Sequence, residues 1–421
     1  MRQPKLLTTL KTYSWELFVA DCLAGATVAM VAMPLSLAIA IASGAQPAQG
    51  LITAIVGGFF ISLVGGSRVQ IGGPTGAFIV VVFGVIEKHG YDGLIVSTFM
   101  AGLILICAGY LRMGRLIAYV PEAVVNGFTI GIAVIIATSQ LKDIFGLSIE
   151  KIPADFIEQL DALWGAISTL NIYAIIIASI SFVLIIGLRK LAPKFPGLIV
   201  AVGIGSGLVA FYSLPVDTIA SRFGELPSQL PYPRLPDISL GRIQELLPTA
   251  MVIAFLAGVE SLLSALVADR MNGGQHRPNA EVLAQGVANV APSLFGGMPA
   301  TGAIARTATN VNAGGKTPVA GLVHAITIFA VMMLAAPLAG YLAMPALAAL
   351  LVITAWNMSE PRKWASYLSL PASDRLLLII TCVLTVLVDL TVAIGIGVTL
   401  GLALRLKSRM TMPDRWRRPE R

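Results

Sequence analysis

Two stretches of this sequence share one broken pattern: IGGPTGAFIVVV, residues 71–82, and MPATGAIARTATNVN, residues 298–312. Each contains Thr-Gly-Ala, at 75–77 and at 301–303, and each follows an apolar segment that ends in Gly-Gly. Neither apolar run is long enough to cross a bilayer as an ordinary helix, which needs about 20 residues. Short apolar segments interrupted by Gly or Pro, at matching places in two halves of a chain, are typical of the substrate site of a membrane transporter.

The composition predicts a polytopic membrane protein. The chain has 421 residues, of which 56% are hydrophobic and 12% are charged. The N-terminal sequence MRQPKLLTTLKTYSWELF is polar and basic, and the first apolar run is a full span, so we expect no cleavable signal. The three cysteines, Cys22, Cys107 and Cys382, lie in or at apolar segments. An odd number of buried thiols argues against a disulfide framework or a metal cluster.

Breakers between the apolar runs divide the chain into fourteen predicted membrane segments, with short half-helices as segments 3 and 10. If the N-terminus is cytoplasmic, most of the 29 Lys and Arg residues fall on the cytoplasmic side. The opposite side holds only Lys88, Lys142, Lys151, Arg222, Arg234 and Arg242. This bias predicts a multi-pass protein of the cell (inner) membrane with both termini in the cytoplasm. It also explains most of the net charge of +7, so no nucleic-acid partner is expected.

The two halves match weakly, since Pro74-Thr75-Gly76-Ala77 parallels Ala300-Thr301-Gly302-Ala303. Seven segments per half is an odd number, so the second half would enter the membrane from the opposite side. The predicted fold class is therefore an all-α polytopic membrane protein with two inverted repeats of seven segments.

The two short helices are the predicted substrate site. Each helix start leaves backbone N–H groups without partners and carries about half a positive charge, so two facing starts form an anion site. Arg306 follows about one turn into the second short helix, and an arginine at the centre of a membrane usually faces protein or water and has a function. The alternative is a structural arginine paired with a carboxylate. The candidate substrate-binding residues are Thr75, Gly76, Ala77, Phe78, Ala303, Ala305 and Arg306.

Glu260 and Ser264 are the candidate cation-coupling residues. They lie one helical turn apart in the predicted eighth segment, AFLAGVESLLSALVADR. Glu260 could carry a proton, coordinate Na⁺ with Ser264, or neutralise Arg306 in a static ion pair. We expect no cofactor, because no His, Cys and carboxylate cluster has metal-ligand spacing. No catalytic constellation is present, so an enzyme is not expected.

Together these residues resemble the sulfate permease (SulP) family of anion transporters. The resemblance is carried by residues 21–29 (DCLAGATVA) before Pro34, by 73–77 (GPTGA), by Glu260, and by Arg306 followed by 312–317 (NAGGKT). It implies a core and a gate domain, elevator-like movement of the core, and a homodimer. It also implies that the residues matching Thr75 to Ala77, Ala305 and Arg306 line the anion site. The family usually ends in a cytoplasmic STAS domain, and none is expected here.

This resemblance sets the expected domain boundaries. They are 1–20, a cytoplasmic N-terminus; 21–135, core segments 1–4 running into the gate; 120–213, gate segments 5–7; 214–247, an extracytoplasmic loop; 248–340, core segments 8–11; 341–407, gate segments 12–14; and 408–421, a basic cytoplasmic tail.

The sequence departs from the family at positions that bear on substrate choice. Leu35 and Ile39 stand where plant-like sulfate carriers have Gln and Tyr, and Ala305 replaces a frequent Ser before the arginine. These changes weaken a sulfate assignment, and Arg306 weakens a sodium–bicarbonate assignment because such members lack it.

We therefore predict a secondary active transporter of a dicarboxylate, sulfate or bicarbonate, working by H⁺-coupled symport. The alternatives are an uncoupled chloride-type exchanger or channel, a Na⁺-coupled bicarbonate symporter, a nucleobase-type carrier, or a membrane protein that acts as a motor or scaffold. Beyond the small anion and a second copy of the chain, membrane lipid is the expected partner.

Overall fold

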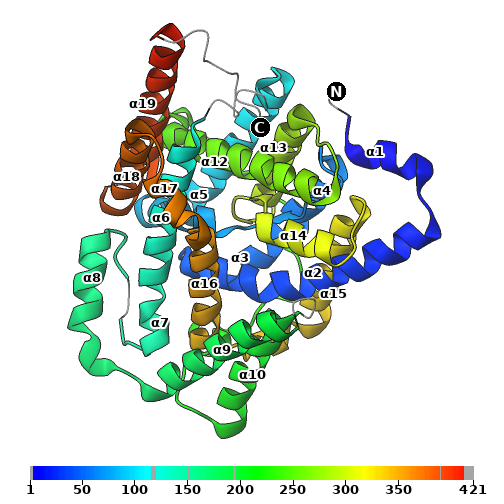
Figure 1. Cartoon of the computed structure of the whole chain (residues 1–421). Coiled ribbons are helices and arrows are strands. Elements are labelled where there is room, and N and C mark those ends of the chain that lie inside the picture. The colour runs from blue at the N-terminus through cyan, green and yellow to red at the C-terminus, as the bar shows by residue number, and fades with distance from the viewer. Residues whose placement is uncertain (1–2, 115–119, 150–151, 193–195, 389, 412–421) are drawn as a thin grey trace.

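The structure is a computed structural model that describes all residues except 1–2, 115–119, 150–151, 193–195, 389 and 412–421. Its described part is almost entirely helical (Figure 1). The helices of the first half are α1 (Lys5–Thr9), α2 (Trp15–Ala42), α3 (Pro47–Ile52), α4 (Gly58–Val64), α5 (Ile79–Tyr110), α6 (Glu122–Ser139), α7 (Leu141–Phe145), α8 (Phe156–Gly165), α9 (Ile172–Leu191), α10 (Gly197–Tyr212) and α11 (Ile219–Phe223).

The second half is also helical. Its helices are α12 (Leu240–Asn272), α13 (Pro278–Leu294), α14 (Ile304–Asn312), α15 (Val319–Gly340), α16 (Met344–Met358), α17 (Trp364–Leu368), α18 (Ala372–Leu387) and α19 (Leu390–Thr411). The described part of the chain also has two strands of two residues each, β1 (Gly72–Gly73) and β2 (Thr301–Gly302). Short 3₁₀ turns lie at 10–12, 76–78, 167–169 and 361–363.

Within the described residues, seven helices are long and apolar enough to cross a membrane, and two shorter apolar helices add to them. Several spans are interrupted. A π-helical turn, Thr53–Gly57, joins α3 to α4, and Gly90, with φ of +69°, breaks the helical geometry of α5. Such interruptions are tolerated at membrane depth where neighbouring protein satisfies the freed backbone groups. The expectation of an all-α polytopic membrane protein is confirmed at this level.

The helices pack in two groups. α2, α4, α5, α12, α13, α14 and α15 contact one another, and α6, α9, α10, α16, α18 and α19 form the other set of mutual contacts. Figure 1 shows α6 to α8 and α17 to α19 on the left of the molecule, and α1, α2, α14 and α15 on the right. α16 lies between the groups and contacts α2 as well as α6 and α9.

Candidate anion-binding site

The two broken stretches lie side by side. β1 pairs antiparallel with β2, so that Gly72 faces Gly302 and Gly73 faces Thr301. The amide of Ala303 also donates to the carbonyl of Ile71 at 2.9 Å. Close approach requires glycine here, because a Cβ on Gly302 would lie 1.5 Å from Nε2 of Gln70. The pairing brings the starts of both short helices to one place.

The first short helix is the 3₁₀ turn after Thr75 together with the part of α5 before Gly90, and it starts immediately after this pairing. Thr75 is extended and caps a 3₁₀ turn, Gly76–Phe78, which continues into α5. The leading amides of this turn have no intrahelical acceptor, as at any helix start. Gly76 lies against Met358 of α16 and Ile136 of α6, which fill the space a side chain would need.

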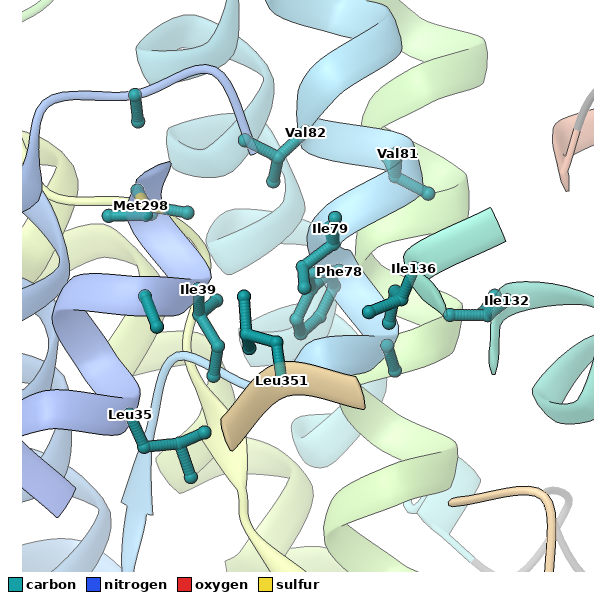
Figure 2. Close-up of a cluster of buried hydrophobic side chains, with 14 of the residues drawn as sticks. Leu35, Ile39, Phe78, Ile79, Val81, Val82, Ile132, Ile136, Met298 and Leu351 are labelled. Atoms are coloured by element: carbon teal, nitrogen blue, oxygen red, sulfur yellow. The ribbon is translucent and has the colours of Figure 1, made fainter. Parts of the chain in front are cut away.

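Phe78 belongs to an apolar cluster. Its side chain is buried with Ile39, Ile136 and Leu351 in the apolar cluster shown in Figure 2. Its ring is therefore packed among apolar side chains in this structure. Ala77 is likewise fully buried.

Arg306 reaches from α14 to the backbone that precedes the first short helix. Nη2 donates to the carbonyl of Pro74 at 3.0 Å and to Oγ of Ser36 at 3.1 Å, and Nη1 approaches the carbonyl of Gly72 at 3.5 Å. The side chain is 2% exposed, and Nε has no partner. All three acceptors are neutral, and no ion pair between described residues includes Arg306. Its positive charge is thus buried, and no described residue places a countercharge in contact with it.

Glu260, in α12, contacts the residue that follows Pro74. Oγ1 of Thr75 donates to its Oε2 at 2.8 Å, and both residues are half-buried. Thr75 follows Pro74, so two adjacent residues contact both charged groups: the Thr75 hydroxyl contacts the carboxylate and the Pro74 carbonyl contacts the guanidinium. Within the described part of the chain Glu260 and Arg306 make no direct ion pair, in contrast to the static pair that the sequence left open.

Ser264 does not share the surroundings of Glu260. It is fully buried, and its hydroxyl donates to Oγ1 of Thr307 at 3.1 Å. Thr307 in turn accepts from the amide of Ile71 at 3.1 Å. In this structure Ser264 therefore fastens α12 to α14 and to the strand region.

One face of α14 is open. Ile304 is 42% exposed, Ala305 and Asn312 are exposed, and Thr309 is half-buried, whereas Ala303 is buried. Positions four and seven residues apart share a helix face, so this opening runs along α14 from its first turn to its last. Ala305, the residue before Arg306, lies on this exposed face.

Two polar residues of α2 with partners in or next to α14 were not among the predicted site residues. Ser36 belongs to α2 and contacts the guanidinium. Asp21, also in α2, accepts from the amides of Lys316 and Thr317 at 2.8 and 3.1 Å and from the hydroxyl of Thr317 at 2.5 Å. It therefore fixes the turn between α14 and α15. Isolated polar residues in apolar helices were the available signal, but their partners are distant in the chain.

The predicted site is distinct from an open cavity elsewhere. That cavity, of about 830 Å³, lies beneath residues 231–237 and is lined by Tyr91, Arg234, Arg242 and neighbours, but by none of the predicted site residues. No group of three or more His, Cys, Asp or Glu that could hold a metal occurs among the described residues.

Relatives of the chain were found by sequence. Residues 18–381 match the model of the sulfate permease family. YvdB of Bacillus subtilis (strain 168), provisionally named a sulfate transporter, is 43% identical over 90% of this chain and 72% of its own length. The bicarbonate transporter BicA of Synechocystis sp. (strain ATCC 27184 / PCC 6803 / Kazusa) is 33% identical over 88% of this chain and 66% of its own.

Solved structures agree with this relationship. The transmembrane domain of a cyanobacterial bicarbonate transporter BicA superposes with a TM-score of 0.81 at 31% identity, covering 91% of this chain and 99% of that one. The structure of SLC26A9, 19% identical, shares the fold with a TM-score of 0.86 over 96% of this chain and 68% of its own. The expected family is confirmed: this chain belongs to the sulfate permease family of anion transporters, which are not enzymes.

Proposed function

We propose that this protein is a secondary active transporter of a small oxyanion, which it binds between the starts of the two short helices. The observation that carries the proposal is the pairing of β1 with β2, which brings both helix starts together beside Arg306. Each start supplies backbone donors and about half a positive charge. Arg306 adds a full charge that only neutral groups contact. Thr75, Gly76, Ala77 and Phe78 contribute from one helix, and Ala303, Ala305 and Arg306 from the other.

The proposed architecture has fourteen segments in two inverted repeats of seven. The antiparallel pairing supports it, because matching points of the two halves approach each other in opposite directions. The two packing groups correspond to a core (segments 1–4 and 8–11) and a gate (segments 5–7 and 12–14), and we propose elevator-like movement of the core. The chain would lie in the inner membrane as a homodimer, with both termini cytoplasmic. The open face of α14 runs towards Lys316, which the charge bias places in the cytoplasm, so this conformation would face inward.

The substrate candidates are a dicarboxylate, sulfate and bicarbonate. Relatives named for sulfate and for bicarbonate support the last two. The exposed side chains at the start of α14, Ile304 and Ala305, offer no hydrogen-bond donors. A surface without side-chain donors favours an anion that accepts fewer hydrogen bonds than sulfate does. A carboxylate and bicarbonate therefore stay among the substrate candidates.

Protons are the proposed coupling ion. Glu260 is half-buried beside Thr75 and close to the helix starts, so its charge opposes an entering anion. Neutralising it by protonation removes that repulsion and leaves Arg306 and the helix ends with a net positive charge. Proton binding would therefore favour anion binding, and reciprocally anion binding would favour protonation.

Uptake into proteoliposomes tests this function. We expect one of radiolabelled sulfate, bicarbonate and fumarate to accumulate against its gradient when a proton gradient is imposed, but not with a sodium gradient alone. Glu260→Gln should abolish accumulation while leaving exchange of the same anion. A chloride-type exchanger would instead show exchange without accumulation in the wild type. If no tested anion is taken up or exchanged, the proposal is wrong.

A further inference from the structure

One face of α13 carries three polar side chains inside the apolar core. Glu281, Gln285 and Asn289 are spaced four residues apart, and all three are completely buried. Residues four apart lie one above the other along a helix. Burying three polar groups in a membrane protein is costly unless each is hydrogen-bonded. Their partners therefore show what this face holds.

Glu281 holds the segment that leads into β1. Its Oε2 accepts from the amides of Gly66 and Ser67 at 2.8 and 3.1 Å. Its Oε1 accepts from Oγ of Ser261 and Nε2 of Gln285, both at 2.9 Å. Ser261 is the residue next to Glu260, so the same carboxylate also fixes α12 at the proposed coupling residue.

Asn289 holds the segment that leads into β2. Its Oδ1 accepts from the amide of Ala300 at 2.9 Å, and its Nδ2 donates to the carbonyl of the same residue at 2.9 Å. This two-way bond fixes both the position and the orientation of the peptide immediately before Thr301. The same segment is also held two residues earlier, where Oγ1 of Thr53 accepts from the amide of Met298 at 2.7 Å.

A neighbouring face of α13 is packed tightly on α5. A Cβ on Gly286 would lie 2.6 Å from the amide nitrogen of Ile106, and one on Gly102 of α5 would lie 2.7 Å from the amide nitrogen of Val290. The two backbones thus touch with no room for side chains between them. These contacts lie in the part of α5 after the break at Gly90, so α13 is fixed to the helix that follows the first short helix.

We infer that α13 is a positioning strut, whose Glu281 and Asn289 set the spacing between the starts of the two short helices. This inference rests on the proposed anion site, because spacing matters only if both helix starts serve one ligand. Neither residue touches the anion. They act through the segments 66–67 and 300, which run directly into β1 and β2.

The role of Glu281 in this strut is geometric and does not require its charge. In Glu281→Gln one oxygen still accepts from the amides of Gly66 and Ser67. The new amide group would face Nε2 of Gln285, but Oε1 of Gln285 has no partner in this structure, so a flip of Gln285 supplies an acceptor. Ser261 can rotate its hydroxyl to accept. Glu281→Leu, of similar size, leaves both loop amides without an acceptor.

Hydrogen exchange of the full chain in detergent, without any anion, provides the first test. We expect Glu281→Leu to raise exchange at least tenfold in peptides covering 66–78, and Asn289→Leu to do so over 298–305. Glu281→Gln should restore most of the protection that Glu281→Leu loses. Ser293→Ala, on the same helix, is the matched control, because that hydroxyl bonds only to the carbonyl of Val290 within α13. If the leucine variants do not fold, Asn289→Asp, which keeps Oδ1 but loses both Nδ2 bonds, serves in their place.

Anion binding provides the second test. For whichever of sulfate, bicarbonate and fumarate stabilises the wild type, we expect both leucine variants to raise Kd at least tenfold, and Ser293→Ala to change it less than threefold. A Glu281→Gln variant as damaged as Glu281→Leu, or unchanged exchange in the leucine variants, would overturn the inference. If no anion stabilises the wild type but the exchange results are as expected, the proposed function is wrong and the positioning role of α13 still holds.

Discussion

Replacing Gly73 by Ala gives a sharp test of how Arg306 is held. Gly73 has φ of +147°, a conformation that L-residues rarely adopt, and lies in β1. A Cβ at this position would lie 2.2 Å from Nη1 of Arg306 and 3.4 Å from Cα of Ala54. The second distance is ordinary van der Waals contact, so the clash lies with the guanidinium. The guanidinium must therefore move by about 1 Å to restore ordinary van der Waals contact.

The size of the effect follows from what that movement breaks. A non-glycine residue in a disfavoured backbone region costs about 1–3 kcal/mol, which lowers the stability of the folded chain. The guanidinium would also lose its bond to the carbonyl of Pro74 or to Ser36, and a hydrogen bond to a charged group contributes about 1.5–3 kcal/mol. Because 1.4 kcal/mol is tenfold in affinity, we expect Kd for the transported anion to rise about 10- to 100-fold.

Gly84→Ala is the matched control. Gly84 lies in α5, shortly after β1 in the chain, has no strained φ, and would place its Cβ in open space. The assay is the anion-dependent shift in Tm of the purified protein, with uptake at saturating and subsaturating anion as a second readout. We expect Gly73→Ala to lose affinity and Gly84→Ala to keep it. A Gly73→Ala variant whose Kd stays within threefold of wild type would show that the position of this guanidinium is not part of anion binding.

Three further variants probe other contacts. Asp21→Leu leaves two loop amides without their acceptor, so we expect a lower Tm from a loss of about 2–5 kcal/mol in the free energy of unfolding. Thr27→Val on the same helix loses a bond within α2 and should change Tm little; equal Tm values for the two variants would contradict this role of Asp21. Gly286→Ala would push α13 away from α5 and should lower Tm markedly, whereas Gly207→Ala, whose Cβ would lie in open space, should not. A Gly286→Ala variant with the Tm of the wild type would refute the close contact. Arg306→Lys keeps the charge but cannot reach the carbonyls and Ser36 together, so Kd measured by thermal shift should still rise more than tenfold, and a wild-type value would show that charge alone suffices.

Local features of the sequence were sufficient to locate the broken stretches. Gly and Pro change the backbone wherever they occur, so the breaks at 72–76 and 300–302 could be predicted without knowing any tertiary contact. The family followed from several spaced motifs, and the match over residues 18–381 confirms it. The grouping of Glu260 with Ser264 also used only local geometry. It describes their spacing on one helix correctly, but the hydroxyl bonds to Thr307 of another helix.

The polar residues that position the site could not be predicted in the same way. The spacing of Glu281, Gln285 and Asn289 is visible in the sequence, but its meaning depends on partners. Glu281 bonds to Gly66, which is 215 residues away. Arg306 bonds to Ser36 at a separation of 270 residues. Such partners are fixed only when the two halves fold against each other, and no local pattern encodes them.

The arrangement of charges at the site limits how coupling can operate. A direct Glu260–Arg306 ion pair would neutralise the arginine and would have to break for an anion to bind, which is expensive for a buried pair. Instead, neutral carbonyls and Ser36 hold Arg306, and Thr75 contacts Glu260. Under the proposed mechanism, the carboxylate acts on the anion through the net charge of the site and not by releasing Arg306. We expect Arg306 and the two short helices to stay in place while that charge changes. A rigid site of this kind can move through the membrane as one body, which is what transport by movement of a whole domain requires.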